Sequence, residues 1–253
     1  MEKYYNSKYY SKPIEVVNIE GEILVIITDS NGREIIYTWY DIIEKNTESI
    51  YINKCLLGGF IKKIPENVLI IGFGGGAFAK YLEDHIKNIH ITGIDIDEAM
   101  IEIAKKELKV KTNDIYIMDA EQAIDKITKK GNKYDLVLID VYGGDGEIPK
   151  YFGNIEFFEK IKNVLNNDGV LSINFADYDL ENVYKKQFYD KIHNNLIKLF
   201  GQYYSHILAG LNDRGNVMGI YNLDKKYEEK DYYDNYKILV NKGKIIYDEN
   251  IIK

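Results

Sequence analysis

The chain has 253 residues, of which 45% are hydrophobic and 29% are charged, a composition that is ordinary for a soluble globular protein. Its formal net charge of −7, from 33 basic and 40 acidic residues, argues weakly against nucleic acid as the main partner, because phosphate binding needs a basic surface. The charge suits a small or cationic substrate; the alternative is that it merely keeps the protein soluble. A single cysteine, Cys55, excludes an intramolecular disulfide and a cysteine zinc cluster, and the lack of a secretion signal or of an apolar run near the roughly 20 residues that span a bilayer predicts a cytoplasmic protein without membrane contact.

The first elements predict a small antiparallel β unit over residues 1–48. Residues 14–40 alternate like β structure, and Asn31-Gly32 between strand patterns at 23–28 and 34–39 is a strong hairpin signal. Tyrosine is frequent, with 23 residues, many of them in Lys/Asn/Tyr-rich patches at the two ends such as Tyr9-Tyr10. We interpret these patches as compositional bias, because a stacking surface for nucleic acid needs basic residues in net excess.

A second unit, residues 49–253, begins with a helix over 49–63 and reaches a glycine cluster. The apolar run 68–71 ends in Gly72-Phe73-Gly74-Gly75-Gly76-Ala77, and an amphipathic segment follows. This pattern predicts a strand, a tight ligand-binding turn and the first helix of a Rossmann-like sheet, in which glycine lets backbone N–H groups approach a ligand. The cluster fits G-x-G-x-G, which suggests S-adenosylmethionine-type cofactors, and also G-x-G-x-x-A, which suggests dinucleotides.

The following segments alternate between strand and helix patterns. Strands are expected at 89–94, 114–118, 134–139 and 170–175, helices near 76–87, 97–108, 120–130, 155–165 and 180–200, and a turn at 166–169. Strand patterns near 203–209 and 216–222 have no room for a helix between them, so they predict a hairpin. A parallel sheet that ends in an antiparallel hairpin strand is the layout of class I methyltransferase-like domains, whereas dinucleotide domains keep a parallel final strand. The expected fold class is therefore α/β, a class I methyltransferase-like Rossmann domain with a small N-terminal antiparallel β unit.

Two acids follow neighbouring strands of the predicted sheet. Asp95 ends the second strand and is expected to accept hydrogen bonds from the hydroxyls of a ribose; the alternative, a helix N-cap, already suits Asp97. Asp119 follows the third strand, where a side chain meets the adenine amino group in the methyltransferase-like layout; the alternative is again an N-cap. We expect the adjacent Ile96 and Ala120 to contact the cofactor as well.

A third acid, Asp140, ends the almost entirely apolar strand at 134–139. A carboxylate at the end of a buried central strand is costly unless it has a task, and ligands bind beyond these strand ends. Asp140 is expected to accept a proton from an amine nucleophile or to hold a cation; the alternative is a turn residue before Gly143-Gly144. The loop 142–149 is glycine-rich and acidic, and it is either a gate over the site or a solvated surface loop.

Other chemistries lack their motifs. The four histidines have no metal-ligand spacing, and the chain has no G-x-S-x-G elbow, no Walker lysine after the glycines and no H-E-x-x-H. We therefore expect no metal.

Taken together, five segments resemble the spermidine synthase family (polyamine aminopropyltransferases). They are VLIIGFGGGAFAKYL, ITGIDIDEAMIEIAKKEL, IYIMDAEQAI, YDLVLIDVYGGDGEIP and NIEFFEKIKNVLNNDGVLSINF. The resemblance implies that Gly72 to Gly76 cradle the nucleoside, that Asp95 holds the ribose and Asp119 meets the adenine, and that Asp140 is the catalytic aspartate. It also implies a homodimer joined through the N-terminal region.

The chain departs from this family at three places. Family members have an acid inside the glycine loop, where this chain has Gly75. They have D-x-x-D after the fourth strand, whereas here Gly143 stands three residues after Asp140, and Asp145 is the nearest acid. Their N-terminal substrate motif is reduced here to residues 48–53. The chain is thus similar to divergent spermidine-synthase-like members.

The sequence as a whole predicts a transferase that moves an aminopropyl group from decarboxylated S-adenosylmethionine to a small-molecule amine. The alternatives are an S-adenosylmethionine-dependent methyltransferase acting on a small molecule and a nucleoside-binding protein without catalysis. Asp140 is the predicted catalytic residue, and Tyr51, Tyr142 and Asp145 are the predicted substrate-binding residues. The predicted cofactor-binding residues are Gly72, Phe73, Gly74, Gly75, Gly76, Asp95, Ile96, Asp119 and Ala120.

Overall fold

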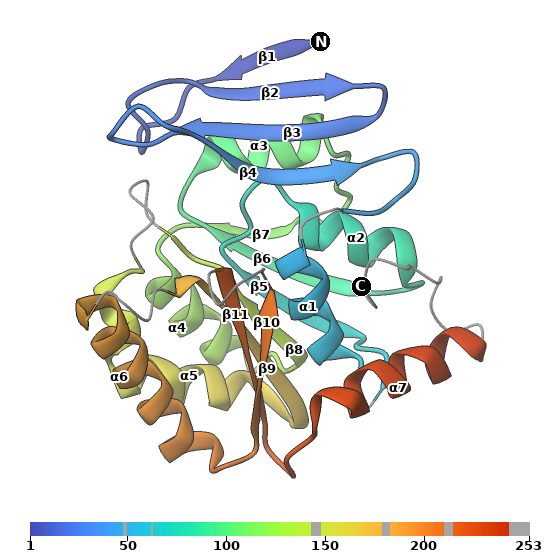
Figure 1. Cartoon of the computed structure of the whole chain (residues 1–253), viewed down its shortest axis with the longest axis vertical. Helices are drawn as coiled ribbons and strands as arrows, with labels where there is room; N and C mark the ends of the chain where they lie inside the picture. The colour runs from blue at the N-terminus through green and yellow to red at the C-terminus, as the bar shows by residue number, and fades with distance from the viewer. Residues whose placement is uncertain (48–49, 62, 143–147, 179–182, 210–214, 243–253) are drawn as a thin grey trace.

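A seven-stranded sheet forms the centre of the chain in this computed structural model, which describes all residues except 48–49, 62, 143–147, 179–182, 210–214 and 243–253 (Figure 1). The strand order is β10-β11-β9-β8-β5-β6-β7. The strands are β5 (Asn67–Ile71), β6 (His90–Asp95), β7 (Asp114–Ile117), β8 (Tyr134–Ile139), β9 (Leu165–Tyr178), β10 (Tyr204–Ala209) and β11 (Gly215–Asn222). Strands β5 to β9 pair in parallel, and β11 runs antiparallel to both β9 and β10. The expected closing hairpin and fold class are confirmed.

Helices cover both faces of this sheet. They are α1 (Ile50–Gly59), α2 (Ala77–His85), α3 (Glu98–Lys106), α4 (Ala120–Lys130), α5 (Ile155–Val164), α6 (Val183–Phe200) and α7 (Glu229–Asn241), with a short 3₁₀ helix η1 (Lys150–Gly153) before α5. Helices α1, α2, α3 and α7 contribute to one hydrophobic core, and α4, α5 and α6 contribute to the core on the other face. Strands β5 and β8 lie between the two cores, which explains why their sequences are nearly continuous apolar runs.

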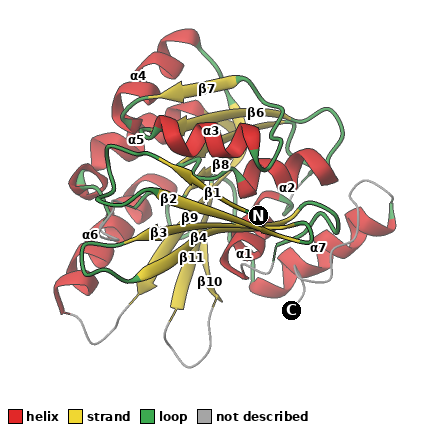
Figure 2. Cartoon of the chain, turned by 90° about the horizontal axis from the view of Figure 1, so that it is seen from above, coloured by secondary structure: helices red, strands yellow, loops and turns green. Residues whose placement is uncertain are grey.

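A separate four-stranded antiparallel sheet, ordered β1-β2-β3-β4, precedes α1. Its strands are β1 (Glu2–Tyr5), β2 (Ile14–Ile19), β3 (Glu22–Thr28) and β4 (Glu34–Asp41). Alternate residues of β3 are buried, and Ile23, Val25 and Ile27 join the core that α2 and α3 share. Figures 1 and 2 show this sheet lying across one end of the molecule, beside α2 and α3. The antiparallel N-terminal unit is therefore confirmed, with two more strands than the single hairpin.

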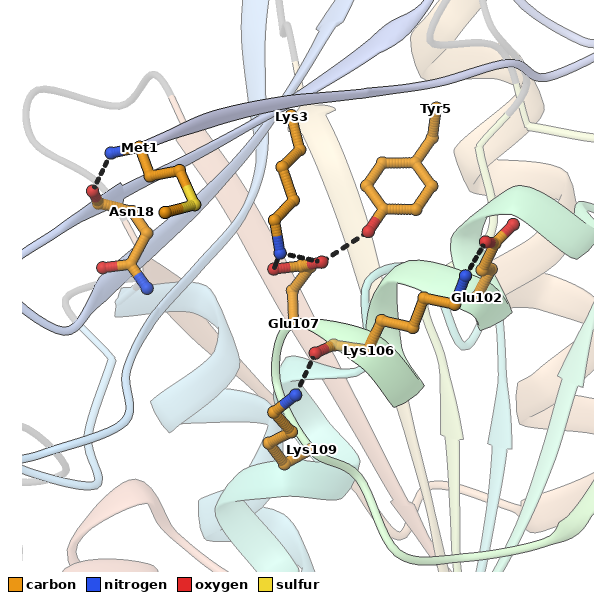
Figure 3. Close-up of polar contacts among 8 residues, drawn as sticks. All are labelled: Met1, Lys3, Tyr5, Asn18, Glu102, Lys106, Glu107 and Lys109. Carbon is orange, nitrogen blue, oxygen red and sulfur yellow. Dashed lines mark hydrogen bonds and ion pairs between the residues drawn. The ribbon is translucent and has the colours of Figure 1, made fainter.

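Strand β1 is held against the end of α3 by polar contacts (Figure 3). The Glu107 carboxylate, one residue beyond α3, accepts hydrogen bonds from Lys3 Nζ at 2.8 and 2.9 Å and from the Tyr5 hydroxyl. At the other end of the same helix, the Ser7 hydroxyl donates to Asp97 at 2.6 Å. Both ends of α3 thus hold the first residues of the chain, which fixes the path of the segment that follows them.

The structure differs from the expectations in two places. Residues 166–169 lie within β9, where the pairing with β8 passes from Tyr134↔Leu165 to Leu136↔Val170, so the expected turn is a bulge that absorbs the extra residues. Strand β1 was not expected at all, because its sequence is short and polar apart from its tyrosines.

Candidate active site at the carboxyl ends of the strands

The glycine cluster forms a tight turn between β5 and α2. Gly72, Gly74 and Gly76 have φ angles of 83°, 51° and 88°, a region that favours glycine. A Cβ on Gly72 would lie 2.0 Å from the Asp140 carbonyl oxygen, so only glycine lets the ends of β5 and β8 approach so closely. The Phe73 side chain turns away from this edge and is buried against Gly93 of β6.

A cavity of about 270 Å³ opens beside this turn, at the carboxyl ends of the parallel strands. Its walls come from the glycine turn, from the residues after β6, β7 and β8, and from the N-terminal sheet unit. The lining residues are Tyr9, Tyr10, Tyr37, Gly72, Ile94, Asp95, Ile96, Asp97, Met100, Met118, Asp119, Ala120, Asp140, Val141, Tyr142, Pro149 and Tyr151. The three candidate acids, Asp95, Asp119 and Asp140, therefore lie around one cavity.

Asp95 ties the glycine turn to the next strand. Its Oδ2 accepts the Gly74 N–H at 2.7 Å, and its Oδ1 accepts the Asp97 N–H at 2.9 Å. Burial raises the pKa of this carboxyl to about 6, although the backbone hydrogen bonds act in the opposite direction. Asp97, not Asp95, caps α3 by accepting the Ala99 N–H at 3.0 Å, so the alternative role of Asp95 as the N-cap of this helix does not hold.

Asp119 lies at the far end of the cavity from Asp140 along the sheet edge and caps α4. Its Oδ1 accepts the Glu121 N–H at 2.9 Å and the Gln122 N–H at 3.4 Å. Apolar side chains surround it in the cavity wall, namely Ile96, Met118 and Ala120. A carboxylate beside an apolar slot suits an adenine ring, because the ring needs flat apolar walls and its amino group needs an acceptor. The capping role and the adenine role are compatible.

Asp140 is half-buried where β8 ends and is held by two neighbouring strands. Its N–H donates to the Ile71 carbonyl of β5 at 2.9 Å, and its Oδ1 accepts a hydrogen bond from Asn174 Nδ2 of β9 at 2.8 Å. Burial raises the pKa of the carboxyl to about 6, against the opposing effect of the Asn174 hydrogen bond. A carboxyl group with this pKa is mostly ionised at pH 7 and takes up a proton readily.

The predicted substrate-binding residues divide into three cases. Tyr142 lines the cavity, and its hydroxyl donates to the Asn174 carbonyl. Tyr51 lies in the first turn of α1, where burial and the charge of Asp140 raise the pKa of its hydroxyl, and its ring packs edge-on against Phe78 with centroids 6.3 Å apart. Asp145 lies outside the described residues.

Four further residues at this edge were missed in the sequence. Tyr9, Tyr10 and Tyr37 line the cavity, so the N-terminal tyrosines that we interpreted as compositional bias lie at the site. Asn174 touches Asp140 from β9 and is buried, and its Oδ1 is one of the buried side-chain atoms without a hydrogen-bond partner in the described part of the chain. Only Asn174 had a detectable signal, since an amide inside an apolar strand is unusual.

Gly75 lies against the N-terminal sheet. A Cβ at this position would lie 2.7 Å from Thr38 Oγ1 and 3.1 Å from a Val25 methyl carbon, and both of those residues are buried. The resemblance implies an acid at this position. The structure has no room for one unless β3 and β4 shift.

The described part of the chain offers neither a metal site nor a helix that could span a membrane. No group of three or more His, Cys, Asp or Glu side chains is placed to hold a metal ion there. No helix in the same residues is long and apolar enough to cross a membrane.

Comparison with known proteins gives a family and a fold. A family profile described as the spermine/spermidine synthase domain matches residues 55–234. The probable spermidine synthase structure from Corynebacterium glutamicum superposes with a TM-score of 0.74 at 16% identity, over 95% of this chain and 87% of that one. At that identity the superposition supports the fold only.

Curated relatives include two kinds of transferase. The polyamine aminopropyltransferase of Vibrio vulnificus is 28% identical over 61% of this chain and 50% of its own length, and that of Pyrobaculum aerophilum is 26% identical over 82% and 78%. The mouse eEF1A lysine and N-terminal methyltransferase is 27% identical over 46% of this chain and 18% of its own length. The matches to the Vibrio and mouse proteins thus span half of the relative's length or less.

Proposed function

The chain belongs to the spermine/spermidine synthase family of transferases, and from that premise we propose that it transfers an aminopropyl group from decarboxylated S-adenosylmethionine to a small amine. The observation that carries the proposal is the shared cavity. Asp95 and Asp119 line its nucleoside end, and Asp140 lines the end where the acceptor would bind. The names of the Vibrio and Pyrobaculum relatives support the same reaction.

The nucleoside is expected to bind along the edge of the sheet. The ribose hydroxyls would donate to Asp95, and the adenine would lie between Ile96 and Met118 with its amino group at Asp119. Asp95 also holds the Gly74 N–H, so the ribose and the glycine turn would share one carboxylate. A sulfonium bound beside Gly72 would then lie near Asp140, because Gly72 is adjacent to the Asp140 carbonyl.

Alkyl transfer needs a positioned, unprotonated nitrogen. The amine nitrogen attacks the carbon next to the sulfonium, the new C–N bond forms as the C–S bond breaks, and sulfur keeps the electron pair as a neutral thioether. The surplus proton on nitrogen passes to Asp140. In an in-line displacement of this kind the protein contributes mainly orientation and proton acceptance.

The raised pKa of Asp140 predicts a pH dependence. The carboxyl must be ionised to accept a proton, and burial raises its pKa to about 6. Transfer should therefore be lost as the pH falls through about 6. The Asp140→Asn variant, which has no titrating carboxyl, should lack this dependence in any residual activity.

Methyl transfer from intact S-adenosylmethionine is the second candidate. It is favoured by the lack of an acid at Gly75, because a carboxylate there would repel the carboxylate of the intact cofactor. The mouse methyltransferase among the relatives supports the same alternative.

One experiment distinguishes the candidates. Purified protein is titrated by calorimetry with S-adenosylmethionine, its decarboxylated form, methylthioadenosine and NAD. Each sulfonium compound is then incubated with mono- and diamines, and the product masses are measured by mass spectrometry. An amine heavier by an aminopropyl group supports the proposal, and an amine heavier by a methyl group supports the second candidate. Nucleoside binding without any product would leave a nucleoside-binding protein, and binding of NAD alone would contradict the nucleoside assignment.

We also propose that the chain forms a homodimer through its N-terminal sheet. The family resemblance implies a dimer joined through this region, and the sheet exposes apolar side chains there, since Ile19 and Ile36 are 55% and 54% exposed. Light scattering of the purified protein should give twice the monomer mass. Replacing both residues by Lys should give a monomer, and an unchanged mass in that variant would contradict this interface.

A further inference from the structure

A tyrosine, Tyr37, lines the cavity close to the glycine turn. The family resemblance implies an acid in this turn, at position 75, where this chain has glycine. The backbone of Gly75 is adjacent to the site, but its Cβ direction is filled by Thr38 and Val25. The residue before Thr38, Tyr37, points to the opposite side of β4 and lines the cavity. Strand β4 therefore blocks a side chain at position 75 with Thr38 and supplies the Tyr37 side chain to the cavity.

Tyr37 lies between the two functional ends of the cavity. Its ring carbon Cε1 is 3.6 Å from where a Cβ on Gly74 would stand, so the ring packs on the glycine turn. Its hydroxyl donates to the Tyr142 carbonyl at 3.4 Å, which connects the turn to the segment after β8. It is close enough to both Asp95 and Asp140 to interact with their charges. A sulfonium placed between a ribose at Asp95 and an amine at Asp140 would lie next to this ring.

Tyr10 supports Tyr37 from the segment between β1 and β2. The Tyr10 hydroxyl lies close enough to that of Tyr37 to interact with it, and Tyr10 also lies near Asp95 and Asp97. The segment is fixed by contacts at the two ends of α3. At one end Ser7 donates to Asp97, and at the other Lys3 and Tyr5 donate to Glu107 (Figure 3). Tyr10, which is distant from the glycine turn in sequence, is thus held in the cavity wall.

We propose that Tyr37, held by Tyr10, recognises the charged tail of the cofactor through its ring face and hydroxyl, in place of the acid that Gly75 cannot provide. This inference rests on the proposed function. An aromatic face attracts a sulfonium or ammonium cation without repelling a carboxylate. The site should therefore accept intact S-adenosylmethionine nearly as well as its decarboxylated form, with affinities that differ by less than about tenfold, the factor that one close charge pair near a surface contributes.

The test is calorimetry on the full chain with three nucleosides. Methylthioadenosine carries the same adenosine as the two sulfonium compounds but no cationic tail, so it reports on folding and on the nucleoside end alone. The Tyr37→Leu variant keeps an apolar side chain without a π face, and Tyr37→Phe keeps the ring without the hydroxyl. Tyr4→Ala is the matched control, because Tyr4 belongs to the same sheet, is 62% exposed and does not line the cavity.

The expected results separate the tail from the nucleoside. Tyr37→Leu should lower the affinity for both sulfonium compounds by about 3- to 30-fold, the range of a cation–π contact, and leave the affinity for methylthioadenosine unchanged. Tyr37→Phe should retain most of the affinity for the sulfonium compounds, and Tyr4→Ala should retain all of it.

Two results would overturn the inference while leaving the proposed function intact. The first is that the Tyr37→Leu variant binds both sulfonium compounds as tightly as the wild type does, or that its affinity for methylthioadenosine falls as much as its affinity for the sulfonium compounds. The second is that the wild type discriminates against intact S-adenosylmethionine by far more than tenfold. Failure of the wild type to bind any of the three nucleosides would instead overturn the proposed function, and the inference with it.

Discussion

The nucleoside end and the acceptor end of the cavity are built over different sequence distances. At the nucleoside end, Asp95 bonds to Asp97 and to Gly74, and Asp119 bonds to the first residues of its own helix. At the acceptor end, Asp140 accepts a hydrogen bond from Asn174, which is 34 residues away, and the Tyr142 carbonyl accepts one from Tyr37, which is 105 residues away. The first end lies within consecutive strand–turn–helix units, which a motif can encode, whereas the second exists only once the sheets are packed together.

The largest expected effect belongs to the acceptor end. Replacing Asp140 by Asn removes the proton acceptor but keeps an oxygen for the hydrogen bond from Asn174. Transfer should fall by about 100- to 10,000-fold, the usual contribution of a general base, while nucleoside affinity stays unchanged. Product mass spectrometry and calorimetry on the same preparation measure both. Unchanged activity in this variant would remove Asp140 from the mechanism.

The packing of the N-terminal sheet against the glycine turn can be tested at Gly75. An Asp there would place its Cβ 2.7 Å from Thr38 Oγ1 and bring a carboxylate against the buried Val25. We expect Gly75→Asp to lower the free energy of unfolding by about 2–4 kcal/mol, from overpacking and desolvation together, and Gly75→Ala to lower it by about 1–2 kcal/mol from overpacking alone. Urea denaturation measures both variants. If Gly75→Asp is as stable as the wild type, β4 does not block this position.

A smaller effect is expected at the nucleoside end. Asp95→Asn weakens the hydrogen bonds to the ribose and to the Gly74 N–H, so methylthioadenosine should bind about 10- to 100-fold less tightly, as expected for lost bonds to a charged group. Asp125→Asn is the control. Asp125 lies on α4, away from the cavity, and forms an exposed ion pair with Lys160 at 2.8 Å. Equal affinities of the two variants would contradict a ribose at Asp95.

The smallest expected effect links the acceptor end to stability. The pKa of Asp140 is raised from 3.8 to about 6 in the folded chain, so the folded state holds a proton that the unfolded state releases between these values. Stability from this group is present below about pH 4 and is lost as the pH rises through about 6. Asp140→Asn should therefore stabilise the fold by about 1–3 kcal/mol at pH 8 and hardly at all near pH 4. An equal effect on the free energy of unfolding at both pH values, measured by urea denaturation, would show that folding does not raise the pKa of this carboxyl.

The sequence predicted the central sheet well because its signals are local. The apolar runs of β5 and β8, the glycine turn and the short connection between β10 and β11 each have a direct structural cause, and the fold class follows from them. The turn expected at 166–169 was wrong because the pairing of β8 with β9 draws these residues into the strand as a bulge.

The candidate site was predictable only in part. Asp95, Asp119 and Asp140 each follow a strand, and parallel strands bring their carboxyl ends to one edge, so their placement around one cavity could be anticipated. Tyr10 and Tyr37 could not, because their position depends on how the N-terminal sheet packs on α3 and on the glycine turn. The ligand contacts of the predicted cofactor and substrate residues remain predictions.

The central claim is that one cavity holds the nucleoside at Asp95 and Asp119 and the amine at Asp140. A crystal structure with methylthioadenosine and an amine bound tests it most directly. The account predicts the ribose hydroxyls on Asp95, the adenine amino group at Asp119 and the amine nitrogen about 3 Å from an Asp140 oxygen, within hydrogen-bond reach. An adenosine bound elsewhere, or an amine nitrogen without contact to Asp140, would contradict it.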